Sequence, residues 1–301
     1  MRVLITGATG LIGQEIVKLC FANGIAVNYL TTSKSKINQS GKTQGFYWNP
    51  KQQEIDLDCF KDVDAIIHLA GATISKRWTS AYKKEIISSR KETTQLLVHS
   101  LKTIDHTVKQ VISASAIGIY PDSLINYYDE TFKNFDDSFL SHVVQVWEHE
   151  VDAFSSLNIT VSKIRIGLVL SNKGGVLMEM AKPIKFGLGA AFGTGEQWQS
   201  WIHVTDLAHL FLYVLKYQLE GVYNGVAPSH VTNQELTKTI AITLGKPLFL
   251  PNIPRFLMKL VLGDMHTLLF DSQRVSSKKI EDKGFYFEYH HLQPALEDLL
   301  K

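Results

Sequence analysis

The glycines near the start of the chain are the residues whose spacing is most informative. Gly7, Gly10 and Gly13 form a GxxGxxG pattern that follows an apolar run over residues 2–6 and precedes a helical pattern. Glycines in such a turn let the backbone approach a phosphate group, and the N-terminus of the following helix attracts its negative charge. The segment predicts a dinucleotide phosphate site; the alternative is a tight turn without a ligand. The predicted contacts are Gly7, Thr9, Gly10, Leu11, Ile12 and Gly13.

The end of the second predicted strand bears on which dinucleotide would bind. An NAD site usually has an acidic residue there, about 20 residues after the glycines, which binds the ribose hydroxyls. This chain has the segment TTSKSK at residues 31–36 instead. Its hydroxyls and lysines attract the 2′-phosphate of NADP, whereas a carboxylate would repel that group. The segment favours NADP, with Thr32, Ser33 and Lys34 as contacts and Lys36 nearby. A polar loop with solvated lysines, and an NAD site, are the alternatives.

A second group of candidate residues lies in the glycine-rich segment GTGEQWQSWIH, residues 193–203. Aromatic rings stack on flat ligands and amide side chains supply directed hydrogen bonds, so this composition is typical of a site for a sugar or a nucleotide. Trp198, Trp201 and His203 are the predicted substrate contacts. The competing interpretation is a structural aromatic cluster beneath a loop, in which His203 orients the loop and Asp206 caps the next helix.

The elements that must position these residues alternate between short β-branched runs and helical patterns. This alternation is typical of βαβ units with right-handed crossovers. The prediction is an α/β fold with a Rossmann-type, doubly wound parallel sheet. Strands are expected over 2–6, 25–31, 64–69, 108–115 and 160–170, and helices over 11–23, 80–101 and 137–157.

After about residue 170 the chain becomes rich in glycine and proline. Residues 206–216 and 293–300 have helical patterns, and Thr232 with Glu235 forms a capping box that begins another helix. We therefore expect a dinucleotide-binding domain over 1–170, to which elements near 200–230 return. A smaller, mixed lobe over 171–301 would pack on it, with the substrate in the cleft between them.

Composition limits the classes of protein to which the chain can belong. The formal charge is only +2, from 31 basic and 29 acidic residues, so nothing requires a nucleic acid or a membrane surface as partner. The two cysteines, Cys20 and Cys59, lack metal-ligand spacing, and no metal site is predicted. No apolar run approaches the ~20 residues of a membrane span, and no signal peptide is recognised. We expect a cytoplasmic protein that binds a small molecule, either as a monomer or as a homodimer.

Several longer motifs resemble those of one protein family. They are LITGATGLIG (4–13), HLAGATI (68–74), RWTSAYKKEIISSRKETT (77–94), SASAIGIY (113–120), RIGLVLS (165–171), GEQWQSWIHVTDL (195–207) and SQRV (272–275). Over essentially the whole chain they resemble the extended, or atypical extended, branch of the short-chain dehydrogenases/reductases. Within that branch they resemble the nucleoside-diphosphate-sugar epimerase-like family, some members of which are described as cell-division-inhibitor-like. The resemblance implies the family's C-terminal domain at about 248–296.

The resemblance also implies cofactor contacts beyond the glycine turn. Ser113 would lie under the nicotinamide ribose, and Arg165 and Gly167 would pass the nicotinamide end. Family members often carry arginine at the position of Thr32, which this chain lacks, although lysines 34 and 36 could substitute. The segment after the strand predicted over 64–69 would line the adenosine and pyrophosphate channel through Leu69, Ala70, Gly71 and Ala72.

The catalytic residues implied by the resemblance are incomplete. Superfamily enzymes use a tyrosine as general acid/base, a lysine four residues later that lowers the tyrosine's pKa, and a serine that orients the carbonyl. Ser115 matches the serine. The tyrosine and lysine positions correspond to Leu140 and Val144, which transfer no protons. The pair Tyr47 and Lys51 has the right spacing but lies in a predicted loop, and we interpret it as chance.

Other residues could transfer the proton. Tyr120 follows Ser115 by five positions, and His142 is about one helical turn from the usual position, with an unperturbed pKa near 6.5. Ser115, Tyr120 and His142 are therefore the predicted catalytic residues. Each candidate has a structural alternative: Tyr120 as a packing residue, His142 as a surface residue, and Glu148, a further candidate, as the partner of a neighbouring base.

Together these features predict an NADP-dependent oxidoreductase or epimerase that acts on a small polar metabolite such as a nucleotide sugar. The alternative comes from another class of protein: a sensor or scaffold that binds the dinucleotide without catalysis. The missing tyrosine-lysine pair favours that alternative, and the complete phosphate motif fits both.

Overall fold

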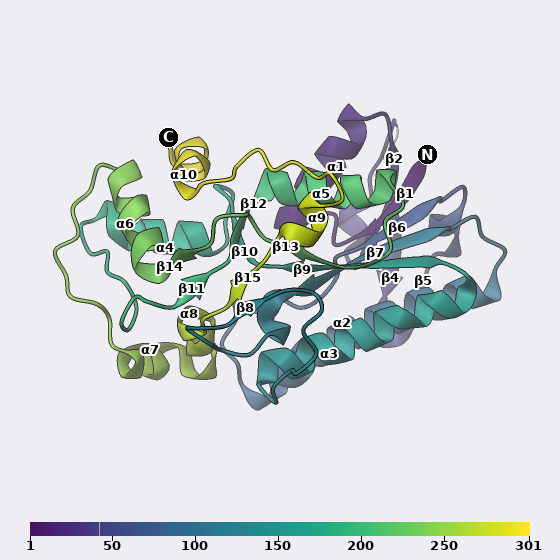
Figure 1. Cartoon of the computed structure of the whole chain (residues 1–301). Helices are drawn as coiled ribbons and strands as arrows, with labels where there is room; N and C mark the ends of the chain where they lie inside the picture. The colour runs from purple at the N-terminus through teal and green to yellow at the C-terminus, as the bar shows by residue number, and fades with distance from the viewer. Residues whose placement is uncertain (42) are drawn as a thin grey trace.

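A sheet of nine strands forms the centre of the computed structural model, which describes residues 1–41 and 43–301 (Figure 1). The strand order is β13-β9-β7-β6-β1-β2-β4-β3, with β5 paired to β4. Neighbours from β13 to β4 run parallel, whereas β3 and β5 are antiparallel to β4. The strands are β1 (Arg2–Thr6), β2 (Ala26–Thr31), β3 (Gln39–Ser40), β4 (Thr43–Asn49), β5 (Glu54–Ile55), β6 (Ala65–His68), β7 (Gln110–Ala116), β9 (Thr160–Ile166) and β13 (Gly221–Gly225).

Helices cover both faces of this sheet (Figure 1). Helices α1 (Leu11–Ala22) and α5 (Val204–Lys216) pack together on one face, and α2 (Ser80–Thr103) and α3 (Phe139–Asp152) on the other. Because both faces are covered, the central strands are continuous apolar runs. The strand order reverses at β1: the chain adds β2 on one side of β1 and later β6 on the other. Such a reversal creates the crevice in which folds of this type bind nucleotides. The predicted Rossmann-type α/β fold is confirmed.

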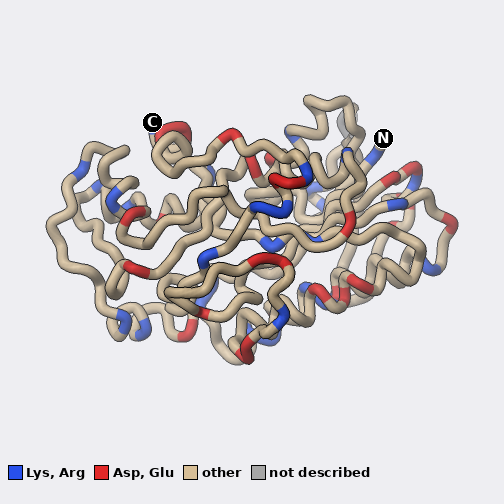
Figure 2. The backbone as a smooth tube through the Cα atoms, in the orientation of Figure 1, with Lys and Arg blue, Asp and Glu red and all other residues tan. Residues whose placement is uncertain are grey.

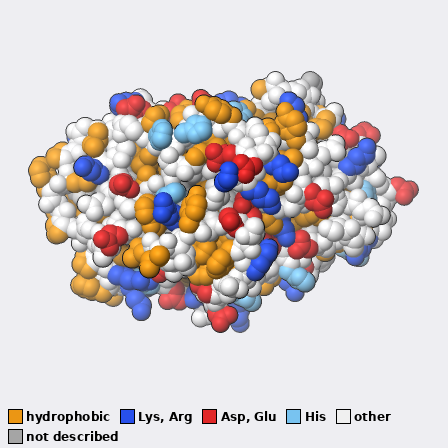
Figure 3. All heavy atoms as spheres, in the orientation of Figure 1, with side chains coloured by type: hydrophobic (Ala, Val, Ile, Leu, Met, Phe, Trp, Pro, Cys, Tyr) orange, Lys and Arg blue, Asp and Glu red, His pale blue; other side chains and the backbone are white. Residues whose placement is uncertain are grey.

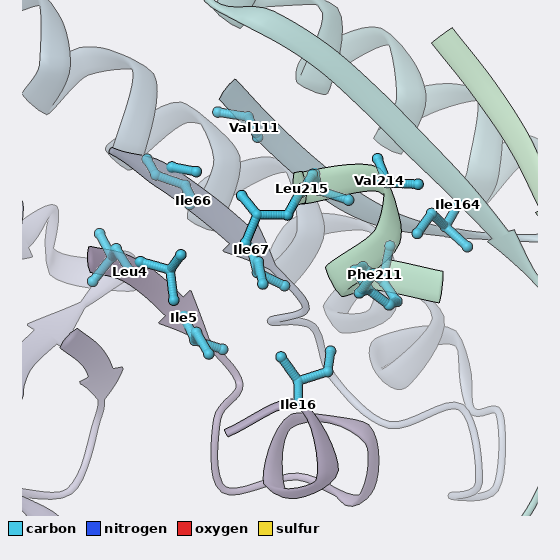
Figure 4. Packing of buried hydrophobic residues seen from close by; sticks show 14 of the residues in the cluster. Leu4, Ile5, Ile16, Ile66, Ile67, Val111, Ile164, Phe211, Val214 and Leu215 are labelled. Carbon is cyan, nitrogen blue, oxygen red and sulfur yellow. The ribbon is translucent and has the colours of Figure 1, made fainter. Parts of the chain in front are cut away.

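The main core lies between the sheet and its helices. Figure 4 shows Ile16 of α1 and Phe211 of α5 beside apolar side chains of the central strands. The labelled strand residues include Leu4 and Ile5 of β1 and Ile67 of β6, all of them fully buried. This packing holds the ends of β1 and β6 together, and these ends carry the glycine turn and the segment after β6.

A smaller lobe lies beside the sheet, at the left of Figure 1. This lobe has an apolar core of its own, to which α4, α6 and α10 contribute. Its helices are α4 (Val176–Lys185), α6 (Asn233–Thr243), α7 (Arg255–Leu262), α8 (Thr267–Phe270) and α10 (Leu292–Leu300). Helix α9 (Lys278–Glu281) lies instead beside β13 and adds Ile280 to the main core. Three strand pairs complete the chain: β10 (Leu168–Leu170) with β12 (Trp201–His203), β11 (Trp198–Gln199) with β14 (Val231–Thr232), and β8 (Tyr127–Tyr128) with β15 (Arg274–Val275). Short 3-10 helices span 34–36, 50–52, 57–60, 117–119, 153–157 and 263–266.

Two local predictions were wrong. The strand predicted over 160–170 divides at Gly167, after which β10 leaves the sheet and pairs with β12. Glycine suits this position because an added Cβ would lie 2.2 Å from the carbonyl oxygen of Ser200. Strand β4 was not predicted, and Tyr47, expected in a loop, lies within it. Its Gly45 resembles a turn residue, but the glycine is needed there because a Cβ would lie 2.5 Å from the ring of Tyr29.

Acidic and basic residues alternate along much of the chain (Figure 2), and side chains of both signs are interspersed with hydrophobic ones on the face shown in Figure 3. In the described ranges, we find no helix with the length and apolarity that crossing a membrane requires.

Candidate functional site

The turn between β1 and α1 has the geometry that its glycines predict. Gly7 adopts a positive φ of 72°, and Gly10 donates its N–H to the Gly7 carbonyl at 2.9 Å. A Cβ on Gly13 would lie 2.3 Å from that same carbonyl oxygen. Helix α1 begins without a capping side chain, so its first N–H groups are available to an anion. The turn therefore fits a phosphate group closely.

A cleft of about 680 Å³ runs beside this turn. Its wall includes the glycine turn, the end of β2, the segment after β6 and the first half of α2. Nine predicted cofactor residues line it together: Gly7, Thr9, Gly10, Thr32, Ser33, Leu69, Ala70, Gly71 and Ala72. Leu11, Ile12 and Gly13 belong instead to the first turn of α1, beside the cleft.

Charged residues at the end of the cleft beside β2 differ in part from the predicted ones. Lys36 lines the wall, whereas the ammonium of Lys34 lies 5.0 Å from the ring centroid of Tyr47. Lys51 and Glu85 also line the cleft and form an ion pair at 2.9 Å. From the sequence, Lys51 was noted only as a chance match with Tyr47, and Glu85 was not singled out. Lys51 was not predicted to line the cleft, because strand β4, which leads to the short helix at 50–52 that carries it, was not predicted.

Beneath the cleft, a buried histidine connects β1, β6 and α2. Thr6 Oγ1 accepts the backbone N–H groups of Leu69 and Ala70 at 3.0 and 3.1 Å. It therefore donates its own proton to Nδ1 of His68, 2.8 Å away. His68 Nε2 in turn lies 3.1 Å from Thr94 Oγ1. Burial, aided by the charge of Arg90, lowers the pKa of His68 to about 4, so the ring is neutral. This network holds the segment after β6 against the glycine turn.

The predicted catalytic serine belongs to a buried ion-pair network. Ser115 Oγ donates to Glu148 Oε1 at 2.6 Å, and Arg165 donates to both carboxylate oxygens at 2.8 and 2.9 Å. Burial would raise the pKa of Glu148, but the Arg165 guanidinium outweighs it and holds that pKa below its usual range. Ser115 is 3% exposed and Arg165 2%. The observed contact is the alternative in which Glu148 pairs with a basic residue, here Arg165. Ser115, Glu148 and Arg165 do not line the cleft.

Tyr120 is part of the same network, while His142 is not. The Tyr120 hydroxyl donates to Asn224 Oδ1 at 2.9 Å and accepts from Arg165 Nη1 at 3.0 Å. Burial raises the pKa of Tyr120 to about 12. His142 is exposed on α3, and Ser113 is fully buried with its hydroxyl donating to the Ala114 carbonyl.

Of the predicted substrate residues, only Trp198 is partly exposed. Its ring centroid lies 4.6 Å from the guanidinium of Arg274, a residue that the sequence analysis did not single out. Trp201 is fully buried in the core of the smaller lobe. His203 is also buried, and it caps α5 because its Nδ1 accepts the backbone N–H of Thr205. These two placements match the alternative interpretation of a structural aromatic cluster.

Comparisons with known proteins place this geometry in a family. A model of the NAD dependent epimerase/dehydratase family matches residues 3–225, and a model of a domain of unknown function, DUF1731, matches residues 253–299. An epimerase family protein of Staphylococcus haemolyticus is 36% identical over 303 residues, which cover 99% of each chain.

Solved structures agree with the family match. The human epimerase family protein SDR39U1, solved with NADPH, has a TM-score of 0.86 and 30% identity over 99% of both chains. A nucleoside-diphosphate sugar epimerase from Corynebacterium glutamicum has a TM-score of 0.79 and 27% identity, covering 100% of this chain and 58% of its own. The UDP-glucose 4-epimerase of Thermus thermophilus, solved with NAD, shares the fold with a TM-score of 0.78 at 20% identity. These matches confirm the resemblance drawn from the motifs, and the chain belongs to the NAD dependent epimerase/dehydratase family.

Proposed function

We propose that the protein binds NADP in the cleft beside the glycine turn and acts as an NAD(P)-dependent oxidoreductase or epimerase. The cleft itself carries the proposal, because it joins a turn shaped for phosphate to the segment after β6 and to the polar end of β2. That end offers Thr32, Ser33 and Lys36 and no carboxylate, which suits a 2′-phosphate. The human relative was solved with NADPH, and NAD is the alternative cofactor because more distant relatives were solved with it.

The substrate that we propose is a small polar metabolite, with nucleotide sugars as the first class to test. The relative from Corynebacterium is described as a nucleoside-diphosphate sugar epimerase, which supports this class. When bound, the dinucleotide would supply a carbon that accepts or donates hydride. We assign the carbonyl-orienting role to Ser115. Its only hydroxyl proton is donated to Glu148, so a substrate oxygen would have to displace that bond.

A second candidate function, a dinucleotide-binding sensor without catalysis, is supported by the same network. The Ser115 and Tyr120 hydroxyls both donate to partners inside the protein. A pKa of about 12 makes Tyr120 a poor acid/base near neutral pH. The two positions at which the superfamily has its tyrosine and lysine hold Leu140 and Val144. Both candidate functions require the dinucleotide, and they differ in whether bonds in a substrate change.

One experiment tests the proposal in two steps. NADPH and NADH are titrated into the purified protein and followed by nicotinamide fluorescence; we expect both to bind and NADPH to bind more tightly. Wild type and S115A are then incubated with NADP⁺ and UDP-glucose or UDP-N-acetylglucosamine, and the sugars are examined by NMR. We expect an epimerised or oxidised sugar with wild type and at least a hundredfold lower turnover with S115A, on the order of the loss of an orienting group.

The control is S155A, which removes an exposed hydroxyl and should leave turnover unchanged. Failure of wild type to bind either dinucleotide would overturn the proposal. Tight NADPH binding without any conversion of these sugars or of simple aldehydes would favour the sensor. Equal turnover by S115A and wild type would remove Ser115 from its assigned role.

A further inference from the structure

Arg90 of α2 is a largely buried cation that has no acidic partner in the part of the chain that the structure describes. No carboxylate in the described parts of the chain comes within 4.0 Å of its guanidinium. Its Nη1 donates to the carbonyls of Ile86 at 2.9 Å and Ala72 at 3.3 Å, and the guanidinium lies 4.8 Å from the ring centroid of Trp147. The Nε atom is buried and has no hydrogen-bond partner among the described residues. Arg90 thus has donor capacity that the protein itself does not use.

Such a charge is costly unless something compensates it. Burial lowers the pKa of Arg90 to about 10, which still leaves the group positive at neutral pH. Other buried cations of this chain are paired: Arg165 with Glu148 at 2.8 Å, and Lys163 with Asp152 at 2.6 Å. An uncompensated buried charge lowers stability, and an anionic ligand that reached it would offset that cost.

The position of Arg90 says which ligand group could reach it. Arg90 lies directly behind the wall of the cleft rather than in its lining. Ala72, whose carbonyl it contacts, belongs to that wall, and so do Ser89 and Thr93 of α2. Ser89 Oγ accepts the N–H of Ala72 at 2.9 Å, which ties that segment to α2. A Cβ on Gly71 would lie 3.3 Å from the Arg90 side chain, so the segment after β6 rests directly on it.

The same segment faces the glycine turn on its other side. A Cβ on Gly7 would lie 3.2 Å from the backbone of Leu69. Arg90 and the glycine turn are therefore separated by one short stretch of chain, residues 69–72. The anion expected at a turn of this kind is the pyrophosphate of a dinucleotide. The 2′-phosphate end of the cleft, at Thr32 and Lys36, lies at the end of β2 instead.

We propose that Arg90 binds an anionic oxygen of the dinucleotide pyrophosphate, a role that rests on the proposed binding of NADP. In the absence of the dinucleotide, the junction of α2, residues 69–72 and α3 carries an unpaired charge. The dinucleotide removes that penalty, so its binding stabilises the contact between α2 and α3 at Trp147. Arg90 is a ligand-binding residue that lowers the stability of the free protein.

Variants R90M and R90K, with K91M as the matched control, test this. Lys91 is the exposed neighbour of Arg90 in α2. Loss of a hydrogen bond to a charged group predicts that R90M binds NADPH, NADH and ADP-ribose about 10- to 100-fold more weakly. Adenosine 2′-monophosphate, which has no pyrophosphate, should bind as it does to wild type. R90K should recover part of the loss, and K91M should match wild type throughout.

Thermal unfolding gives the readout that a structural role would not produce. Because R90M removes an unpaired buried charge but keeps an apolar stem, its free protein should unfold at or above the wild-type temperature. The increase in the unfolding temperature on adding NADPH should be smaller for R90M than for wild type. A free R90M protein that unfolds several degrees earlier, with binding of all nucleotides reduced alike, would show a structural role and overturn the proposal.

Two other outcomes would also overturn it, for different reasons. R90M that binds NADPH as wild type does, while its binding of UDP-glucose is weakened, would assign the anion to the substrate and leave the proposed function intact. Wild type that binds no dinucleotide would defeat the proposed function and this inference together.

Discussion

At the scale of single residues, surroundings decide which polar groups remain available for chemistry. Ser115, Tyr120 and Arg165 were all candidates for work at the cofactor, and the structure joins them to one another and to Glu148. Glu148 could be suspected of pairing with a base from the sequence alone, but its partner could not be named. Arg165 lies on a different element, 17 positions away.

His68 provides a prediction at this scale. Its pKa is about 4 in the folded protein and near 6.5 in the unfolded chain, because burial disfavours the charged ring. Between these values the unfolded chain binds a proton that the folded protein does not. Stability therefore falls as pH falls through this window. Between pH 7 and pH 5 the loss due to His68 should be about 2 kcal/mol.

The measurement is urea unfolding of wild type and H68N at pH 7 and pH 5. H68N should lose less stability on acidification, by about the same 2 kcal/mol, whatever its stability at pH 7. The exposed His149, replaced in H149N, is the control and should leave the wild-type pH dependence in place. An H68N protein with the full wild-type pH dependence would contradict the assigned protonation state.

At the scale of elements, the unit of β1, the glycine turn and α1 was predicted from sequence almost to the residue. An apolar run, three spaced glycines and an amphipathic pattern are all local signals within 21 residues, Arg2 to Ala22. Helix α6 is similar, since its capping box of Thr232 and Glu235 is present as predicted. Strand β4 was not predicted because its Gly45 resembles a turn residue. The reason for this glycine is the close approach of the Tyr29 ring, which belongs to another strand.

Substitution G13A tests whether close approach or helix propensity governs the turn. Propensity alone predicts that alanine inside a helix stabilises the protein by about 1 kcal/mol. The added Cβ, however, would lie 2.3 Å from the Gly7 carbonyl oxygen and 2.7 Å from Cα of Ala8, both of which are backbone atoms that cannot turn aside. We expect a net loss of about 1–3 kcal/mol and weaker NADPH binding.

Urea unfolding and NADPH titration of G13A give both quantities. K18A, an exposed change in the same helix, should alter neither by a measurable amount. A G13A protein that is more stable than wild type would show that propensity prevails and that the turn tolerates a side chain.

At the scale of the whole molecule, the buried carboxylate of Asp206 helps to connect the Rossmann-type part to the end of the chain. Asp206, fully buried at the start of α5, accepts the backbone N–H groups of Glu288 and Tyr289 at 2.8 and 3.0 Å. The ring of His203 stacks on that of Tyr289, with centroids 4.0 Å apart. These contacts hold the segment before α10 against α5. The sequence suggested instead that Asp206 caps its own helix, a role that His203 performs.

We expect D206A to lower stability by about 2–4 kcal/mol, because two N–H groups lose their acceptor. D206N keeps one carbonyl oxygen and should fall between D206A and wild type. Thermal unfolding measures the loss, and limited proteolysis should release a C-terminal fragment from D206A earlier than from wild type. D282A removes an exposed carboxylate of the same region and serves as control. A D206A protein as stable and as protease-resistant as wild type would contradict this role.

The sequence by itself determined the fold class, the family and the glycine turn. Each depends on patterns that neighbouring residues carry, such as strand and helix periodicity or the spacing of glycines. These patterns also located the polar end of β2 and the segment after β6, because both immediately follow predicted strands.

Only the tertiary structure decided which side chains share a site. It brought Lys36 rather than Lys34 to the cleft, joined Ser115 to Glu148 and Arg165, and left Arg90 without an acidic partner among the described residues. Each outcome depends on burial and on charges from elements far apart in the chain, and periodicity within one element does not carry that information.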